Sequence, residues 1–590
     1  MGLKIILAAA LSAASAAFAS AASAQPDAAG RLQRLMDEHW AWTLEQRPIL
    51  ATSLGVRDHD DRLRSVSLEA AAARDAQAAA FLERLEAIDA AALDPADRIN
   101  YDLLRLDLRT DVEAAPYGME YLLMSNRSGP HTFLARLPGQ LPFFTMADYE
   151  SYIARLGDAP RYLGEAQQTL RAGAAAGWTQ PCEPMAGVEA SIRFHVTDSA
   201  DDSVFMKPFA QKPDAISARD WRGLRRRAAR AVERDVLPAM AAFADFYAEE
   251  YAPACREDLG ASGFPDGEAY YAWRAKVFTT TDMSVDEIHD LGLSEVARIR
   301  AEMMEVIGEV EFDGDFKAFQ TFLRTDPQFY AGTPEELVAA VSVIAKKADG
   351  AMPLVFGTLA RMPYTVQPVP ADIAEGTTTA YYERPAGDGT RAGVYRINTS
   401  LLDQRPLFEL EALGLHEAVP GHHHQIALSQ ELDLPPFRRY GGFTAFIEGW
   451  GLYAESLGLE MGFYQDPYSN FGRLSYEMWR ACRLVVDTGL HAKGWTKQQA
   501  VDFMAENTAL SLHNIEAEVN RYITGPGQAL AYKVGELKMQ ALRDRAEEEL
   551  GAAFDVRRFH DALLGNGAVP LSFLETHMDA WIEMEKARTR

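Results

Sequence analysis

The clearest candidate for chemistry is a histidine-rich stretch at residues 413–425, which reads LGLHEAVPGHHHQ. In the HExxH pattern, two histidines one helical turn apart bind zinc, and the glutamate after the first acts as a base. His416 and Glu417 match the start of that pattern, but the position where the second histidine belongs is Pro420. A metal site here therefore needs a second histidine at another spacing.

His422 is the predicted second ligand. On an ideal helix, residues six apart point about 120° away from each other. Pro420 cannot donate a main-chain hydrogen bond and clashes with the preceding turn, while Gly421 tolerates almost any backbone angle. We expect these two residues to interrupt the helix and to bring His422 beside His416. His423 is the alternative ligand, although on a regular helix it would lie about 10 Å along the axis.

A third ligand is predicted in residues 442–455, which read GFTAFIEGWGLYAE and are apolar almost throughout. Two carboxylates in a buried helix are costly unless they are paired or coordinated. We assign Glu448 as the third metal ligand. Glu455 is expected to orient a ligand histidine, to serve as an alternative ligand, or to form an ordinary ion pair. Gly449 and Gly451 weaken a helix, and we expect them to admit another helix at close range.

The competing interpretation is an exposed histidine cluster with incidental metal affinity. Residues 407–419 are too apolar for a surface helix. His416 and Glu417 would then be buried polar groups that need partners. The sequence therefore favours a metal site.

A polar stripe recurs at helical spacing along residues 476–491. Its members are Tyr476, Arg480, Arg483, Asp487 and His491. Such a stripe on an apolar helix either lines a cavity or forms a structural Arg–Asp network. We expect His491 to stabilise an oxyanion, or else Tyr532 to do so.

Gly-Pro-Gly at residues 525–527 predicts a break between two helices and the exposure of Tyr522 and Tyr532. We expect the side chains near this break to contact substrate. An arginine is expected to bind a substrate carboxylate, and the candidates are Arg480, Arg483 and Arg521. The strand predicted at residues 393–398, which ends at Asn398, is expected to pair with a peptide backbone at its edge.

Together these residues predict a zinc hydrolase with one Zn²⁺ ion bound by His416, His422 and Glu448. Glu417 is the expected general base, which takes a proton from water and passes it to the leaving amine. The predicted substrates are short peptides. The alternatives are a zinc-dependent amidase or esterase, and a non-catalytic exported protein that binds metal or peptide.

Helical periodicity dominates the chain that must position these residues. Helices are predicted over residues 31–50, 70–88, 146–173, 218–251 and 285–307, and over most of the chain from 404 onward. The helix at 285–307 begins with a capping box, SVDE. Few β-strands are predicted: one at 117–124, and two that form a hairpin at 377–383 and 393–398. We predict a mainly α fold with a small β-sheet, divided into residues 25–275 and 276–590 or folded as one unit.

Residues 1–24 have the layout of a secretory signal peptide, with a basic start, an apolar run and Ala-Ser-Ala before Gln25. An uncleaved anchor is the alternative. No cysteine lies near the cleavage point and no other stretch reads as a membrane span, so we expect a periplasmic or secreted protein. In an oxidising compartment Cys182 and Cys255 can pair, or they remain two separate thiols.

The composition limits the possible partners. The 590 residues include 58 Lys and Arg against 85 Asp and Glu, which gives a net charge of −27. Such a surface repels phosphate backbones and anionic lipids, so no nucleic-acid partner is expected. Three cysteines cannot build a Cys₄ zinc site.

Three of these motifs resemble those of the bacterial domain-of-unknown-function 885 family. They are HEAVPGHH from residue 416, EGWGLYAE from 448 and RYITGPGQALAYK from 521, with a weaker match at 279–293. Members are commonly exported and are similar to helical zinc peptidases, including oligopeptidases and carboxypeptidases. The resemblance implies a large helical fold with the metal centre in a deep groove and the small sheet near it. It leaves the substrate open.

Overall fold

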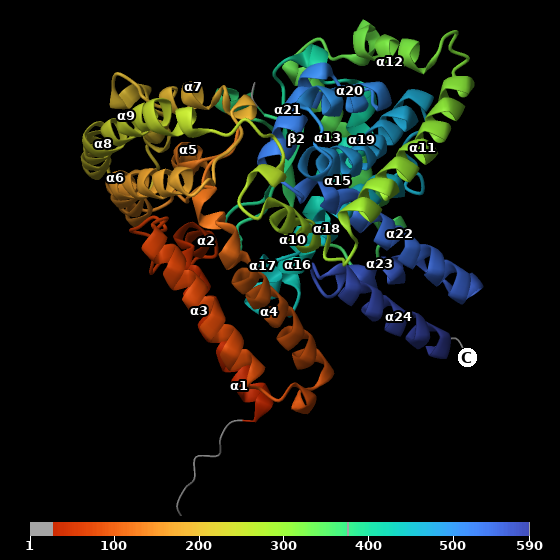
Figure 1. The fold of residues 1–590 in the computed structure, drawn as a ribbon, viewed down its shortest axis with the longest axis horizontal. Helices are drawn as coiled ribbons and strands as arrows, with labels where there is room; N and C mark the ends of the chain where they lie inside the picture. Colours follow the sequence, from red (N-terminus) through yellow and green to blue (C-terminus); the bar gives the residue numbers. More distant parts are fainter. Residues whose placement is uncertain (1–26, 375–376, 589–590) are drawn as a thin grey trace, which may run out of the picture.

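The computed structural model describes residues 27–374 and 377–588, so the predicted signal peptide lies outside it. The fold is mainly α, as predicted (Figure 1). The helices are α1 (Ala28–Gln46), α2 (Pro48–Ser53), α3 (Leu68–Glu86), α4 (Pro95–Ala114), α5 (Pro130–Gln140), α6 (Met146–Ala175), α7 (Val188–Arg193), α8 (Ala218–Ala231), α9 (Leu237–Phe246), α10 (Gly267–Thr279), α11 (Val285–Glu309), α12 (Phe316–Thr325), α13 (Pro334–Val355), α14 (Ala371–Ala374), α15 (Leu410–Glu417), α16 (His422–Glu431), α17 (Pro436–Tyr440), α18 (Thr444–Leu457), α19 (Pro467–Ala492), α20 (Lys497–Asn507), α21 (Leu512–Thr524), α22 (Ala531–Leu550), α23 (Val556–Leu564) and α24 (Leu571–Arg588).

The main core forms around α19, which is buried on almost every side. α11 packs along α19, and a Cβ added at Gly292 would lie 2.7 Å from Leu484 Cβ, so the two helices are in close contact there. The predicted capping box starts α11, because Ser284 and Glu287 bond each other's main-chain N–H groups. α18 packs against α22 beside this pair.

A second core lies apart from the first. Buried side chains of α5, α6, α8 and α9 form it, together with Leu63 and Val66. In Figure 1 these helices gather on the left, away from α11, α19 and α22. The buried residues of α1, α3 and α4 instead belong to the main core with the C-terminal helices. The two hydrophobic cores therefore do not coincide with the predicted lobes at 25–275 and 276–590, because the helices α1, α3 and α4 belong to the core of the C-terminal helices.

The sheet has three strands, β1 (Tyr364–Pro368), β2 (Ala380–Glu383) and β3 (Gly393–Ile397), in the order β1-β3-β2. β2 and β3 pair antiparallel, with Tyr382 opposite Tyr395, so the predicted hairpin is confirmed. β1 runs parallel on the other side of β3. β3 is therefore the central strand, and the prediction that its edge pairs with a peptide is wrong because both of its edges are already paired.

The strand predicted at 117–124 is also wrong. The chain there forms two short 3₁₀ helices, η2 (Ala115–Tyr117) and η3 (Met119–Tyr121). Gly118 separates them with a φ of 54°, a left-handed conformation that glycine adopts without strain. A Cβ at this position would meet the ring of Trp178 at 2.7 Å. The left-handed turn at Gly118 therefore prevents the strand that the aromatic residues of this segment suggest.

Cys182 and Cys255 form a disulfide with their Cα atoms 5.0 Å apart. A main-chain hydrogen bond joins the same two segments, since the Cys182 N–H donates to the carbonyl of Arg256 over 2.9 Å. Cys482 is a buried free thiol in α19, as its apolar surroundings in the sequence indicate. Within residues 27–374 and 377–588, no helix is long and apolar enough to cross a membrane.

Candidate metal centre

Three predicted ligands come together in the main core. His416 lies in the last turn of α15, His422 begins α16, and Glu448 lies in α18. One ligand atom from each lies within 4.8 Å of the other two. The Oε2 atom of Glu448 is 3.4 Å from Nε2 of His422 and 3.8 Å from Nε2 of His416. The three side chains thus point at one small volume.

An interrupted helix brings the two histidines together. α15 stops at Glu417, and α16 begins five residues later. The Gly421 N–H donates to the carbonyl of Leu415 over 2.9 Å. A Cβ at Gly421 would lie 2.0 Å from the carbonyl oxygen of His416, so only glycine fits this turn. The two imidazole rings end 4.6 Å apart and nearly perpendicular, as the predicted break requires.

Two glycines place Glu448 beside these rings. A Cβ at Gly449 would lie 2.5 Å from the main chain of Gly535, so α18 and α22 touch backbone to backbone. This is the close helix approach predicted from the sequence. A Cβ at Gly451 would instead meet Cε1 of His416 at 2.6 Å. The second glycine thus makes room for the imidazole rather than for a helix.

Glu455 fixes the orientation of His416. The imidazole donates from Nδ1 to Oε1 of Glu455 over 2.8 Å, which leaves Nε2 directed toward Glu448. Carboxylates commonly hold metal-binding histidines in this way. Arg480 contacts the same oxygen at 3.1 Å and stacks on Trp479. The expectation that Arg480 binds substrate is therefore wrong, since this buried guanidinium is used to hold Glu455.

The electrostatics of the cluster favour a cation. Burial opposes a charged imidazole, but Glu448 and Glu455 outweigh it and raise the pKa of His416 to about 9. Burial likewise opposes a charged Glu448, yet the two histidines hold its pKa well below the usual range. Ligand atoms around a tetrahedral zinc ion lie about 3.3 Å apart, given bonds of about 2.0–2.1 Å. The observed separations of 3.4 and 3.8 Å are close to that value.

The family model described as "Bacterial protein of unknown function (DUF885)" matches residues 48–578. The chain belongs to this family. A solved structure of a candidate lipoprotein from Colwellia psychrerythraea is similar to the DUF885 chain, with 29% identity and a TM-score of 0.89. The similarity covers 94% of this chain and 99% of that one. A candidate lipoprotein of unknown function from Shewanella oneidensis shares the fold, with 18% identity and a TM-score of 0.64 over 94% and 100% of the chains. No curated protein matches the chain.

The predicted base of this DUF885 protein, Glu417, directly follows His416 and is 8% exposed. Among the described residues, no group donates a hydrogen bond to its carboxylate. Tyr395 of β3 is buried nearby, and its hydroxyl has no partner in the described chain. Burial and then the charge of Glu417 raise the pKa of Tyr395 well above its usual range. The sequence does not reveal Tyr395, because a tyrosine in a short strand carries no catalytic signature.

The two histidines after His422 are not part of the cluster. His423 donates from Nε2 to the carbonyl of Met362 and accepts at Nδ1 from the Tyr382 hydroxyl, each over 2.9 Å. Neither ring nitrogen is free, so His423 is excluded as the alternative ligand. His424 packs on Phe356 with ring centres 4.6 Å apart. Burial lowers the pKa values of His423 and His424 to about 4 and 3.

His491 is a structural residue rather than an oxyanion donor. Its Nδ1 accepts from the N–H of Ala261 over 2.9 Å, and its Nε2 donates to the carbonyl of Tyr522 over 3.0 Å. Both nitrogens are used and the side chain is buried, so the predicted catalytic role is wrong. Tyr522 is also buried rather than exposed, and its hydroxyl accepts from Trp479 and Arg483.

Asn398 is likewise wrong as a substrate-binding residue. Its amide nitrogen donates to the carbonyls of Ala374 and Thr377, at 2.6 and 2.8 Å. Its oxygen accepts from the Ser400 N–H over 3.0 Å. The side chain is fully buried, and it fixes the connections that flank the sheet.

Tyr532, Arg483 and Arg521 remain close to the candidate centre. Tyr532 is half-buried; burial and then the charge of Glu448 raise the pKa of its hydroxyl. The guanidinium carbon of Arg483 lies 4.2 Å from the centre of the Tyr532 ring. Arg521 binds Glu518 at 2.6 Å.

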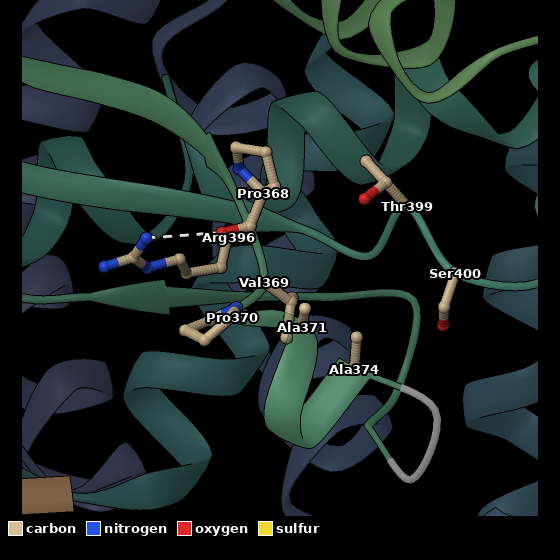
Figure 2. Close-up of a pocket in the computed structure, with 8 residues that line it drawn as sticks. All are labelled: Pro368, Val369, Pro370, Ala371, Ala374, Arg396, Thr399 and Ser400. Atoms are coloured by element: carbon tan, nitrogen blue, oxygen red, sulfur yellow. Dashed lines mark hydrogen bonds between the residues drawn. The ribbon is translucent and has the colours of Figure 1, made fainter. Parts of the chain in front are cut away.

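A pocket beside the sheet is separate from this centre. It holds about 500 Å³ and is lined by Pro368, Val369, Pro370, Ala371, Ala374, Arg396, Thr399 and Ser400 (Figure 2). Arg396 donates within the same region to Gln367 over 2.8 Å and to Pro368 over 3.3 Å. Its lining contains none of the predicted site residues, and its one charged side chain already has partners.

Proposed function

We propose that this protein is an exported zinc-dependent metallopeptidase that hydrolyses short peptides. The observation that carries the proposal is the convergence of His416 Nε2, His422 Nε2 and Glu448 Oε2. Two imidazoles and one carboxylate form the donor set of catalytic zinc sites, which keep one coordination position open. Glu455 on the far nitrogen of His416 adds the outer support that such sites have.

The chemistry divides between the ion and the protein. Bound zinc lowers the pKa of a water molecule and polarises a carbonyl group. Glu417 takes the proton of the attacking water and gives it to the leaving amine. Its carboxylate is suited to this because it accepts no hydrogen bond from the described residues. Glu455 and Arg480 keep the imidazole of His416 in one orientation during these steps.

Export and peptide specificity rest on separate observations. The signal-peptide pattern of residues 1–24 and the Cys182–Cys255 disulfide support an oxidising compartment outside the cytoplasm. The structural neighbours described as candidate lipoproteins agree with export. Peptides are the proposed substrates because members of the family are similar to helical zinc peptidases, and the peptide library below tests this choice.

The test is a comparison of metal content and turnover in the mature chain. Zinc is quantified by mass spectrometry of the metal, and cleavage is followed in a mixed peptide library. Glu417→Gln should keep one zinc per chain and lose at least a factor of about 10³ in turnover, because the base is removed but no ligand is. Glu411→Gln is the matched control, since Glu411 lies in the same helix but accepts from the Tyr464 N–H.

Two results would contradict the proposal. One is a wild-type chain that binds no zinc after incubation with the ion. The other is a Glu417→Gln variant that hydrolyses peptides at the wild-type rate. If the wild type hydrolyses esters or non-peptide amides and leaves the whole peptide library intact, the protein is a zinc hydrolase of another class.

A further inference from the structure

Three arginines share one buried glutamate next to the candidate metal centre. Glu518 is 2.6 Å from Arg521, 3.0 Å from Arg483 and 3.6 Å from Arg127. We call Arg127, Arg483 and Arg521 the arginine cluster. The buried Asp487 accepts at Oδ1 from the Tyr271 hydroxyl and the Gly527 N–H and forms no ion pair with these arginines within the described residues. The cluster therefore carries more positive charge than its neighbours compensate.

The cluster also has unused hydrogen-bond donors. Nη1 of Arg483 is buried and has no partner within the described chain. Arg127 contacts Glu518 only at 3.6 Å, and its side chain is 27% exposed. Arg521 is 21% exposed, so a solute can reach both. Buried guanidinium donors without partners are costly, and a bound anion would satisfy them.

Tyr532 connects the cluster to the metal centre. The contact of Gly449 with Gly535 fixes α18 against α22. Glu448 is the residue before Gly449, and Tyr532 lies one turn before Gly535, so both side chains leave the helices near this crossing. The Arg483 guanidinium lies over the Tyr532 ring, 4.2 Å from its centre. The charge of Glu448 also acts on the Tyr532 hydroxyl, so this ring lies close to both the predicted zinc ligand and the arginine cluster.

Arg127 comes from a part of the chain far from the other two. Its loop is held against the end of α21, because the hydroxyl of Thr524 donates to Asn126 over 2.8 Å. Gln180 donates to the carbonyl of Met124 over 2.9 Å on the same loop. The cluster is therefore assembled only when the N-terminal and C-terminal parts of the fold meet.

We propose that the arginine cluster binds the free C-terminal carboxylate of the substrate, which makes the protein a carboxypeptidase that removes one or two residues. Guanidinium groups match a planar carboxylate and bind it with charge-assisted hydrogen bonds. Tyr532 is close to both Glu448 and Arg483, so a carboxylate bound by the cluster would place a bond near the substrate C-terminus beside the predicted metal. This inference rests on the proposed function for the position of that bond.

The test compares an N-acetylated tripeptide that has a free C-terminus with the same peptide as its C-terminal amide. The wild type should cleave the acid with a kcat/KM at least about a hundredfold higher. Arg127→Gln and Arg521→Gln should each raise KM for the acid at least about tenfold and leave the amide unchanged. Arg171→Gln is the control, because Arg171 makes a similar two-point contact with Glu250 outside the cluster.

Binding of the same two peptides, measured by calorimetry, tests the carboxylate site independently of the proposed peptidase activity. If the acid binds more tightly than the amide and Arg127→Gln removes the difference, the carboxylate site is supported even if no peptide is cleaved. If peptides are cleaved but the acid and the amide are equal substrates, or Arg127→Gln has no effect on either, the inference is overturned and the peptidase proposal stands. Circular dichroism and melting temperature of each variant show whether it has folded.

Discussion

Nδ1 of His416 donates to Oε1 of Glu455 over 2.8 Å, inside a core where both side chains are buried. The bond selects the tautomer that leaves Nε2 free as an acceptor. That nitrogen faces Glu448 and His422. A single hydrogen bond therefore determines which face of the imidazole is available to a cation.

Glu455→Gln should weaken zinc binding by a factor of about 10 to 100, the range typical for the loss of an outer carboxylate. The amide accepts more weakly than the carboxylate and also loses the ion pair to Arg480. Competition with a chelator of known affinity measures the change. An unchanged zinc affinity would show that Glu455 is an ordinary ion-pair residue.

Gly451→Ala should displace His416 and lower zinc affinity at least tenfold, because the new methyl group would lie 2.6 Å from Cε1 of that ring. Gly308→Ala is the matched control in α11, where no atom lies within 4 Å of the new Cβ. The control should be neutral or stabilise the protein by up to about 1 kcal/mol. Equal zinc affinities in the two variants would refute the predicted contact.

Stability should fall as the pH decreases below about 6.5, in part because of His491. Burial lowers the pKa of this histidine to about 3 in the folded protein, whereas the unfolded chain binds the proton near pH 6.5. Between these values the unfolded state holds one more proton, so His491 removes about 1.4 kcal/mol for each pH unit of acidification. Its contribution is fully present above pH 6.5.

Urea unfolding at pH 7 and pH 5 measures this dependence. His491→Gln should be less stable at pH 7, since the ring bonds to Ala261 and Tyr522 are lost. Its stability should also change less between the two pH values than that of the wild type, by the equivalent of about one proton. If the two proteins have the same pH dependence, His491 does not stay neutral in the folded state.

The break that forms the site could be predicted from neighbouring residues, because Pro420 and Gly421 act on the turn that contains them. The glycines of α18 correctly predicted a close contact with another helix at Gly449. The sequence did not show that Gly451 instead makes room for an imidazole. Helical spacing correctly grouped Arg480, Arg483 and His491 on one buried helix. It could not identify their partners, which lie on other elements.

Those partners account for the errors. Arg480 is bound to Glu455, and His491 is bound to two main-chain groups, so neither is available to a substrate. Tyr395 and Arg127 were missed for the same reason, since each reaches the site through tertiary packing alone. The central position of β3 also could not be predicted, because its pairing with β1 is a contact between separate segments of the chain.

Zinc content of two adjacent variants tests the central claim most directly. His422→Gln removes a predicted ligand, whereas His423→Gln changes a side chain that is held by Tyr382 and Met362. After incubation with zinc and removal of the excess, the wild type and His423→Gln should each contain one ion per chain, and His422→Gln should contain almost none. A His422→Gln protein that keeps a full ion of zinc would contradict the account.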